Sequence, residues 1–188
     1  MLKKSEGIIC VLMCFIISNC ASRGNTPLQI ENVHNEFSNV KLMQPLSDAV
    51  RYLGLEKGAA FSLSDIDADI IIVQIFSMYC PKCQSDAENV NEFYRLINEE
   101  ELSIKMVGIG FANSDFEVAI FKKKFNISFP LFPDPYGDAA RELQAYSTPY
   151  FLVAKKTDDG TFEAIYTKED KMGRPRSFLK TVLLKAKE

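Results

Sequence analysis

The sequence predicts an α/β protein with a central mixed β-sheet flanked by helices. Residues 70–76 form a short β-branched apolar run, typical of a strand buried on both faces, and apolar side chains at helical spacing follow it. A second apolar run at residues 104–111 is also followed by a helix signal. Residues 150–155 and 161–166 then flank an Asp-Asp-Gly turn as an antiparallel hairpin. These strands and helices account for the predicted sheet and its cover.

The other expected elements are short and follow in chain order. Ser114 and Glu117 form a capping box, so a helix should run from there to about residue 125. We further expect a short helix at 45–55, a strand or edge segment at 61–66, a strand at 129–132, a turn at 133–137, a short helix at 138–145 and a last amphipathic helix at 176–185.

Length and composition are those of one globular domain. The chain has 188 residues, of which 47% are hydrophobic and 25% charged, enough for a sizeable core. The formal net charge of -3 gives no reason to expect a nucleic-acid partner.

A Cys-x-x-Cys motif lies where the first buried strand passes into a helix. Pro81 suits a first helical turn, because the amide hydrogen it lacks would have no partner there. Free amides and the helix dipole stabilise a thiolate, and Lys82 adds a nearby positive charge, so we expect Cys80 to be acidic. Cys83 is then placed to attack a mixed disulfide at Cys80 and release the partner.

A zinc half-site and a static disulfide are the structural alternatives for this motif. Zinc would need two more ligands, but the other cysteines lie in the first twenty residues and the only histidine is His34. A disulfide between Cys80 and Cys83 would close too short a loop to stabilise the fold much. We therefore favour a redox pair, expect no metal and no cofactor beyond a redox-active Cys80–Cys83 disulfide, and interpret His34 as a solvated linker residue.

The N-terminus has the pattern of a targeting segment. Two lysines precede an apolar run at residues 7–18, which is too short to span a bilayer but suits a signal peptide over residues 1–19. Residues 17–21 resemble a bacterial lipobox, in which Cys20 would be diacylated and become the first mature residue. Asn19 departs from the usual Gly, Ala or Ser. Ordinary signal-peptidase cleavage nearby and an uncleaved anchor are the alternatives.

The segment after Cys20 is polar, and we interpret residues 20–44 as a flexible tether and residues 45–188 as the domain. The sequence thus predicts an exported protein held by lipid on the periplasmic side of a bacterial membrane. Outside the cytosol an isolated thiol pair is either a disulfide framework or a redox device, and the spacing favours the latter.

The motifs together resemble those of the thioredoxin superfamily. Cys80-Pro81-Lys82-Cys83 follows an apolar strand, Thr148-Pro149 directly precedes another at residues 150–153, and an extra strand-helix unit lies between them. Within the superfamily the chain looks like the membrane-tethered TlpA and ResA type of thiol-disulfide oxidoreductase, in the redoxin group related to AhpC/TSA proteins. The similarity covers about residues 61–188.

The resemblance implies a thioredoxin-like fold with the extra unit and an enzyme that reduces or exchanges protein disulfides, for example in cytochrome c maturation or periplasmic redox homeostasis. It implies that Thr148-Pro149 is a cis peptide against the Cys80 sulfur, where its backbone pairs with the substrate chain; a trans proline opening a strand is the alternative. The implied partners are exported thiol or disulfide proteins and an upstream membrane electron donor or acceptor. Pro81 and Lys82 leave the direction of electron flow open.

Three residues matter for how far the resemblance extends. Tyr79 stands where most relatives have tryptophan, which keeps an aromatic wall but adds a hydroxyl. Gln74 occupies the position of the buried aspartate of thioredoxin and cannot relay a proton. Asp86 matches a glutamate of the TlpA and ResA type that acts as base for the second cysteine, and helical spacing puts it on the side of Cys83. A carboxylate that stabilises the first helical turn is the alternative for Asp86.

Other functional classes compete with disulfide exchange. Peroxiredoxins, also in the redoxin group, carry a proline four and a threonine three residues before the reactive cysteine, where this chain has Phe76 and Ser77. A copper-delivery protein of the Sco type needs three residues between its cysteines and a later histidine. A binding module that holds thiol-bearing partners without turnover stays open.

Overall fold

The computed structural model describes residues 40–42, 47–55 and 60–188. The expected signal peptide, Cys20 and His34 lie outside the described residues, and so does most of the expected tether. Within the described part, no helix combines the length and the apolar character needed to cross a bilayer.

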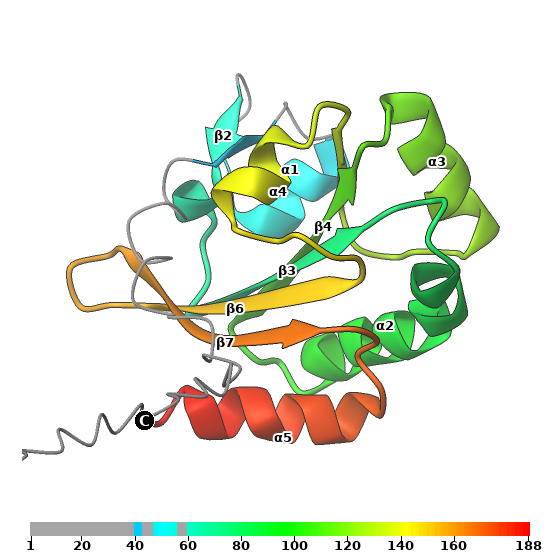
Figure 1. The fold of residues 1–188 in the computed structure, drawn as a ribbon. Helices are drawn as coiled ribbons and strands as arrows, with labels where there is room; N and C mark the ends of the chain where they lie inside the picture. Colours follow the sequence, from blue (N-terminus) through cyan, green and yellow to red (C-terminus); the bar gives the residue numbers. More distant parts are fainter. Residues whose placement is uncertain (1–39, 43–46, 56–59) are drawn as a thin grey trace, which may run out of the picture.

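A five-stranded mixed sheet forms the centre of the domain, as predicted (Figure 1). Its strands are β3 (Ile70–Phe76), β4 (Ile104–Phe111), β5 (Leu131–Asp134), β6 (Tyr150–Lys156) and β7 (Phe162–Glu169), in the order β5-β4-β3-β6-β7. β4 runs parallel to both β3 and β5, whereas β6 runs antiparallel to both β3 and β7. β3 is therefore the central strand, with a parallel neighbour on one side and an antiparallel one on the other.

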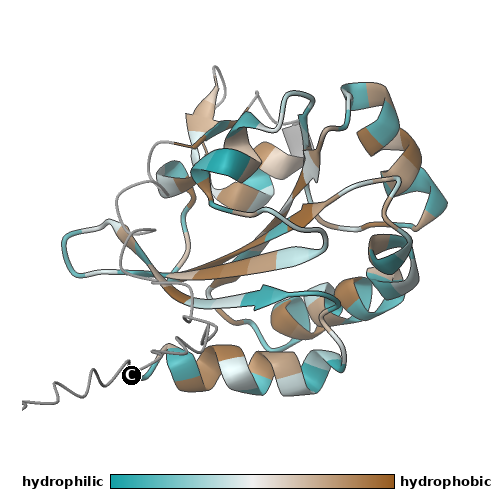
Figure 2. Cartoon of the chain, in the orientation of Figure 1, coloured by the Kyte–Doolittle hydropathy of each residue, from teal (hydrophilic) through white to brown (hydrophobic). Residues whose placement is uncertain are grey.

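Helices cover both faces of the sheet (Figure 1). The helices are α1 (Ser47–Leu53), α2 (Pro81–Glu99), α3 (Asp115–Lys124), α4 (Asp138–Glu142) and α5 (Pro175–Lys185). One core cluster packs α2, α3 and α5 against the even-numbered side chains of β3, and the other packs α1 and α4 against the odd-numbered ones. Apolar residues accordingly concentrate in the strands between these layers (Figure 2).

The central strands confirm the prediction from apolar runs. β3 and β4 begin and end at the expected residues, and all seven residues of β3 are buried. Two glycines of β4 lie under the extra unit: a Cβ on Gly108 would collide with Leu131, and one on Gly110 would collide with Val118. The absent side chains let α3 and β5 approach β4 closely.

The fourth expected strand was misplaced by two residues. We expected a strand at residues 129–132 and a turn from Pro133, but β5 includes Pro133 and Asp134. β5 is an edge strand, where a proline without an amide hydrogen is tolerated. The Asp134 carboxylate accepts hydrogen bonds from the amides of Ala139 (3.3 Å) and Ala140 (3.0 Å), which joins the strand to the start of α4.

The tether prediction was wrong at its C-terminal end. Val40 is fully buried and Leu42 nearly so, and β1 (Lys41–Leu42) pairs antiparallel with β2 (Phe61–Ser62). The apolar alternation of Val40 and Leu42 supplies the burial that a tether would lack. The expected strand at 61–66 is also shorter, because a capping box between Ser62 and Asp65 turns the chain into a 3-10 helix, η3 (Leu63–Asp65).

Candidate active site

The two cysteines lie at the start of α2, at the end of the central strand. Cys80 is the N-cap residue of α2 and Pro81 occupies its first turn, as predicted. The Cys80 sulfur accepts a hydrogen bond from the amide of Cys83 at 3.1 Å. Both cysteines are free thiols, with Cys80 half-buried and Cys83 fully buried. A partner can therefore reach Cys80 and not Cys83.

The surroundings of the two thiols drive their pKa values apart. Partial burial opposes ionisation of Cys80, but hydrogen bonds from the Cys83 and Thr148 side chains and from nearby backbone amides outweigh it, so its pKa lies below the ordinary value. Burial raises the pKa of Cys83 to about 12, and the nearby Cys80 sulfur adds to this effect. Of the two thiols, Cys80 therefore ionises more readily.

The Thr148–Pro149 peptide bond is cis and faces the reactive sulfur, as the family resemblance implies. Pro149 directly precedes β6, whose first residue Tyr150 pairs with Ile75 of β3. This pairing brings the chain before β6 beside the end of β3. The Cys80 thiol donates to the carbonyl oxygen of Thr148 at 3.3 Å.

Tyr79 and Lys82 lie at the surface beside the motif. Tyr79 is 66% exposed, and its hydroxyl donates to a carboxylate oxygen of Glu117 in α3. This bond raises the pKa of Tyr79 and lowers that of Glu117. The Lys82 ammonium forms an exposed ion pair with Asp170 at 3.1 Å, so its charge is shared with the segment after β7.

Asp86 is fully buried, and its carboxylate is held on both oxygens. One oxygen accepts from the amide of Met172 at 2.5 Å and the other from the side-chain amide of Asn89 at 2.9 Å. The first turn of α2 contains no acidic residue, so the alternative of a helix-start charge is wrong. Asp86 instead ties α2 to the segment between β7 and α5, one turn beyond Cys83.

Gln74 lies in β3 and is only 3% exposed. Its even number in the strand places it on the sheet face that carries the Cys83 cluster. The structure thus places a neutral amide at this buried position of the central strand.

Sequence reasoning missed three residues that hold the loop before Cys80. Asn113 accepts from the amide of Met78 at 2.7 Å, Gln84 donates to the carbonyl of Met78 at 2.7 Å, and Glu117 binds the hydroxyl of Tyr79. The capping box had identified Glu117 only as a helix-start residue. Nothing in the local pattern around Asn113 signals a contact with a residue 35 positions earlier.

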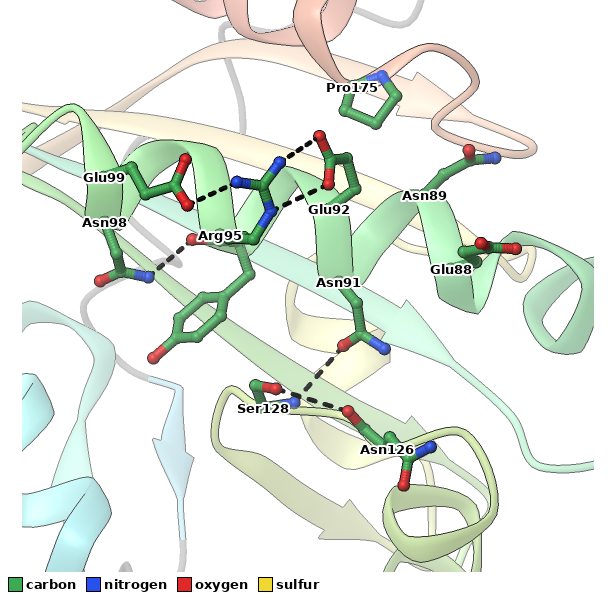
Figure 3. Close-up of a pocket in the computed structure, with 11 residues that line it drawn as sticks. Glu88, Asn89, Asn91, Glu92, Arg95, Asn98, Glu99, Asn126, Ser128 and Pro175 are labelled. Atoms are coloured by element: carbon green, nitrogen blue, oxygen red, sulfur yellow. Dashed lines mark hydrogen bonds and ion pairs between the residues drawn. The ribbon is translucent and has the colours of Figure 1, made fainter.

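A surface groove of about 800 Å³ lies along α2 and includes neither cysteine. Its polar side chains bind one another: Arg95 pairs with Glu92 (2.7 Å) and Glu99 (2.5 Å), and Asn91 accepts from the amide of Ser128 at 3.4 Å (Figure 3). Across residues 40–42, 47–55 and 60–188, no cluster of three or more His, Cys, Asp or Glu could hold a metal ion.

Several solved structures share this architecture. StoA from Bacillus subtilis matches with a TM-score of 0.55 at 21% identity, covering 76% of this chain and 94% of that chain. A secreted Mycobacterium tuberculosis disulfide oxidoreductase homologous to Escherichia coli DsbE matches with a TM-score of 0.56 at 16% identity. The match covers 82% of this chain and 99% of that chain. A thioredoxin-like protein from Aeropyrum pernix matches with a TM-score of 0.55 at 16% identity, covering 82% of this chain and 92% of that chain. These likenesses establish the thioredoxin-like fold.

A comparison with curated proteins gives no match. The model of the AhpC/TSA family, in contrast, matches residues 44–168, about two thirds of the chain. The matched region contains both cysteines, the cis proline and the extra unit of α3 and β5. The chain therefore belongs to the AhpC/TSA family.

Proposed function

We propose that the protein is a thiol-disulfide oxidoreductase that works through Cys80 and Cys83. The observation that carries this proposal is the placement of the Cys80 sulfur. It is partly open to partners and lies between the N-terminus of α2 and the Thr148 carbonyl, while Cys83 is buried one turn behind it. This asymmetry gives one thiol for attack and another for resolution.

The exchange proceeds in two balanced steps. The Cys80 thiolate attacks one sulfur of a partner disulfide, so that a Cys80–partner disulfide forms and the partner's other sulfur leaves as a thiolate. Cys83 then loses its proton and attacks the Cys80 sulfur. The Cys80–Cys83 disulfide forms, the second partner sulfur leaves, and two electrons have passed from the protein to the partner. The reverse sequence oxidises a partner dithiol, and the relative reduction potentials decide the direction.

The geometry favours disulfide exchange over peroxide reduction. The resolving thiol lies on the same helical turn as the nucleophile, as suits a partner that forms a mixed disulfide at Cys80. Insulin reduction with dithiothreitol, run beside a peroxide-consumption assay, tests the proposal against both alternatives. Turnover of insulin supports the proposal, and peroxide consumption without insulin turnover favours a peroxidase. A Cys80–Cys83 pair that is reduced by dithiothreitol but turns over neither substrate favours a binding module.

The location and partners belong to the same proposal. A lipid on Cys20 would hold the domain at the periplasmic side of a membrane, within reach of exported thiol or disulfide proteins and of a membrane electron donor or acceptor. The secreted M. tuberculosis oxidoreductase of the same fold supports exchange outside the cytosol.

Alkylation should distinguish the two thiols. In the reduced protein, the rate of Cys80 alkylation by iodoacetamide should rise with pH about a midpoint below the ~8.5 pKa of free cysteine, because the Cys80 thiolate is stabilised. Cys83 should stay unmodified at pH 7, because burial raises its pKa. Trypsin cleaves after Lys82, so mass spectrometry reads the two cysteines in separate peptides. Equal modification at pH 7 would contradict the assignment.

Mixed disulfides should accumulate in only one of the two cysteine variants. Cys83→Ser should trap partners on Cys80, because the attacking thiol remains and the resolving one is lost. Cys80→Ser should trap few, because its remaining thiol is buried. Non-reducing gels followed by mass spectrometry measure the trapped species, and comparable trapping by both variants would exclude these roles.

Asp86→Asn tests proton transfer from Cys83, whose high pKa calls for a base. We expect about 10²-fold slower release of a mixed disulfide, because an amide cannot take the proton. The loss of stability should be smaller than in Asp86→Ala, because the amide oxygen can still accept from Met172, although the new NH2 group then faces the Asn89 amide. Asp86→Ala, the control, should also lose about 1–3 kcal/mol of unfolding free energy by leaving that amide unpaired. An unchanged stopped-flow rate in Asp86→Asn would leave Asp86 as a structural tie alone.

Lipid attachment is tested by metabolic labelling with a palmitate analogue. The wild type should be labelled and Cys20→Ala should not, because the thioether-linked diacyl group of a bacterial lipoprotein requires that sulfur. Cys14→Ala, a substitution in the apolar run, is the matched control and should be labelled like the wild type. Label retained by Cys20→Ala would reject the anchor.

A further inference from the structure

The loop between β3 and α2 is held by side chains from outside it. The loop consists of residues 77–79, and the amide of Cys80 closes it by donating to the carbonyl of Ser77 at 3.1 Å. Both polar backbone groups of Met78 are bound by carboxamides: its amide donates to Asn113 at 2.7 Å and its carbonyl accepts from Gln84 at 2.7 Å. The backbone just before the reactive cysteine is thus fixed at both polar groups.

Asn113 lies at the corner where β4 passes into α3 and is fully buried. Besides accepting from Met78, its side chain donates to the carbonyl of Ala112 at 3.0 Å and to the hydroxyl of Ser77 at 3.4 Å. A carboxamide offers one acceptor and two donor hydrogens, so these three bonds use each of its groups. Asn113 therefore joins the extra strand-helix unit directly to the loop that precedes Cys80.

We propose that Asn113 is a positioning residue for the exchange reaction, which holds the 77–79 loop so that the Cys80 sulfur stays between the Cys83 amide and the Thr148 carbonyl. This inference rests on the proposed function. β3 and α2 are regular elements, so the loop between them determines where the N-cap sulfur lies. The two sulfur contacts, 3.1 Å to the Cys83 amide and 3.3 Å to the Thr148 carbonyl, depend on that placement.

Each charged side chain near the loop has a partner in the wild type, and none of these partners is Asn113. Glu117 from α3 binds Tyr79 and Ser114, and Lys82 from α2 pairs with Asp170 after β7. Buried Asp86 binds Met172 and Asn89. The Asn113 carboxamide carries no charge and does not titrate. A changed pH profile in an Asn113 variant would therefore report a moved sulfur and not a lost charge.

The test is the pH dependence of Cys80 alkylation in the full-length reduced protein, read in its own tryptic peptide. Asn113→Ala should shift the midpoint pH of Cys80 alkylation upward, because a displaced sulfur loses the bond from the Cys83 amide, which stabilises the thiolate; the contact with the Thr148 carbonyl favours the thiol and its loss does not add to this shift. Alkylation well below the midpoint should slow by about threefold or more, which corresponds to half a pKa unit. Asn91→Ala is the matched control, because Asn91 also joins α2 to a loop, through Phe125 (2.9 Å) and Ser128 (3.4 Å). Its Cys80 profile should equal that of the wild type.

The outcomes separate the inference from the proposed function. An Asn113→Ala profile equal to the wild type's, or an equal shift in Asn91→Ala, overturns the inference. If Asn113→Ala does not fold, Gln84→Ala is used instead. This substitution removes the bond to the Met78 carbonyl and replaces a side chain that is only half-buried. An unchanged Cys80 alkylation profile in Gln84→Ala would also overturn the inference. A wild type that shows the low midpoint but no insulin turnover contradicts the proposed function and leaves the positioning role standing.

Discussion

The abrupt change from strand to helix at the end of β3 is the constraint on which the site depends. The turn closes over residues 77–79 and leaves the Cys80 sulfur as the acceptor of a free amide of α2. Because β3 is central, the segments after β4 and before β6 both reach its carboxyl end. Asn113 arrives from one side and Pro149 from the other, so the strand order itself assembles the site.

Local sequence patterns predicted the elements whose causes are local. β3 and β4 are continuous apolar runs, and the Ser114–Glu117 capping box marked the start of α3. Cys80 at the N-cap followed from the position of Pro81. Such features need only a few neighbouring residues, so the amino-acid order determines them.

Features that depend on contacts between residues far apart in the sequence could not be predicted from local patterns. β5 extends through Pro133 because it lies at a sheet edge, and Val40 is buried because β1 pairs with β2. Asp86 was recognised as a candidate base, but its bond to the Met172 amide spans 86 positions. Asn113 was missed for the same reason, since an asparagine after a strand is a common loop residue until its partner is known.

The two glycines of β4 bear on how a fold accommodates added structure. The side chains nearest to a Cβ at Gly108 would be Leu131 and Phe129, and those nearest to a Cβ at Gly110 would be Val118 and Asn113; Phe76 of β3 lies beside both positions. The tightest contacts at both positions come from residues after β4, Leu131 over Gly108 and Val118 over Gly110. The packing of α3 and β5 thus constrains two positions of a strand that precedes both elements in the chain, and a larger residue at either position would push these elements away from β4.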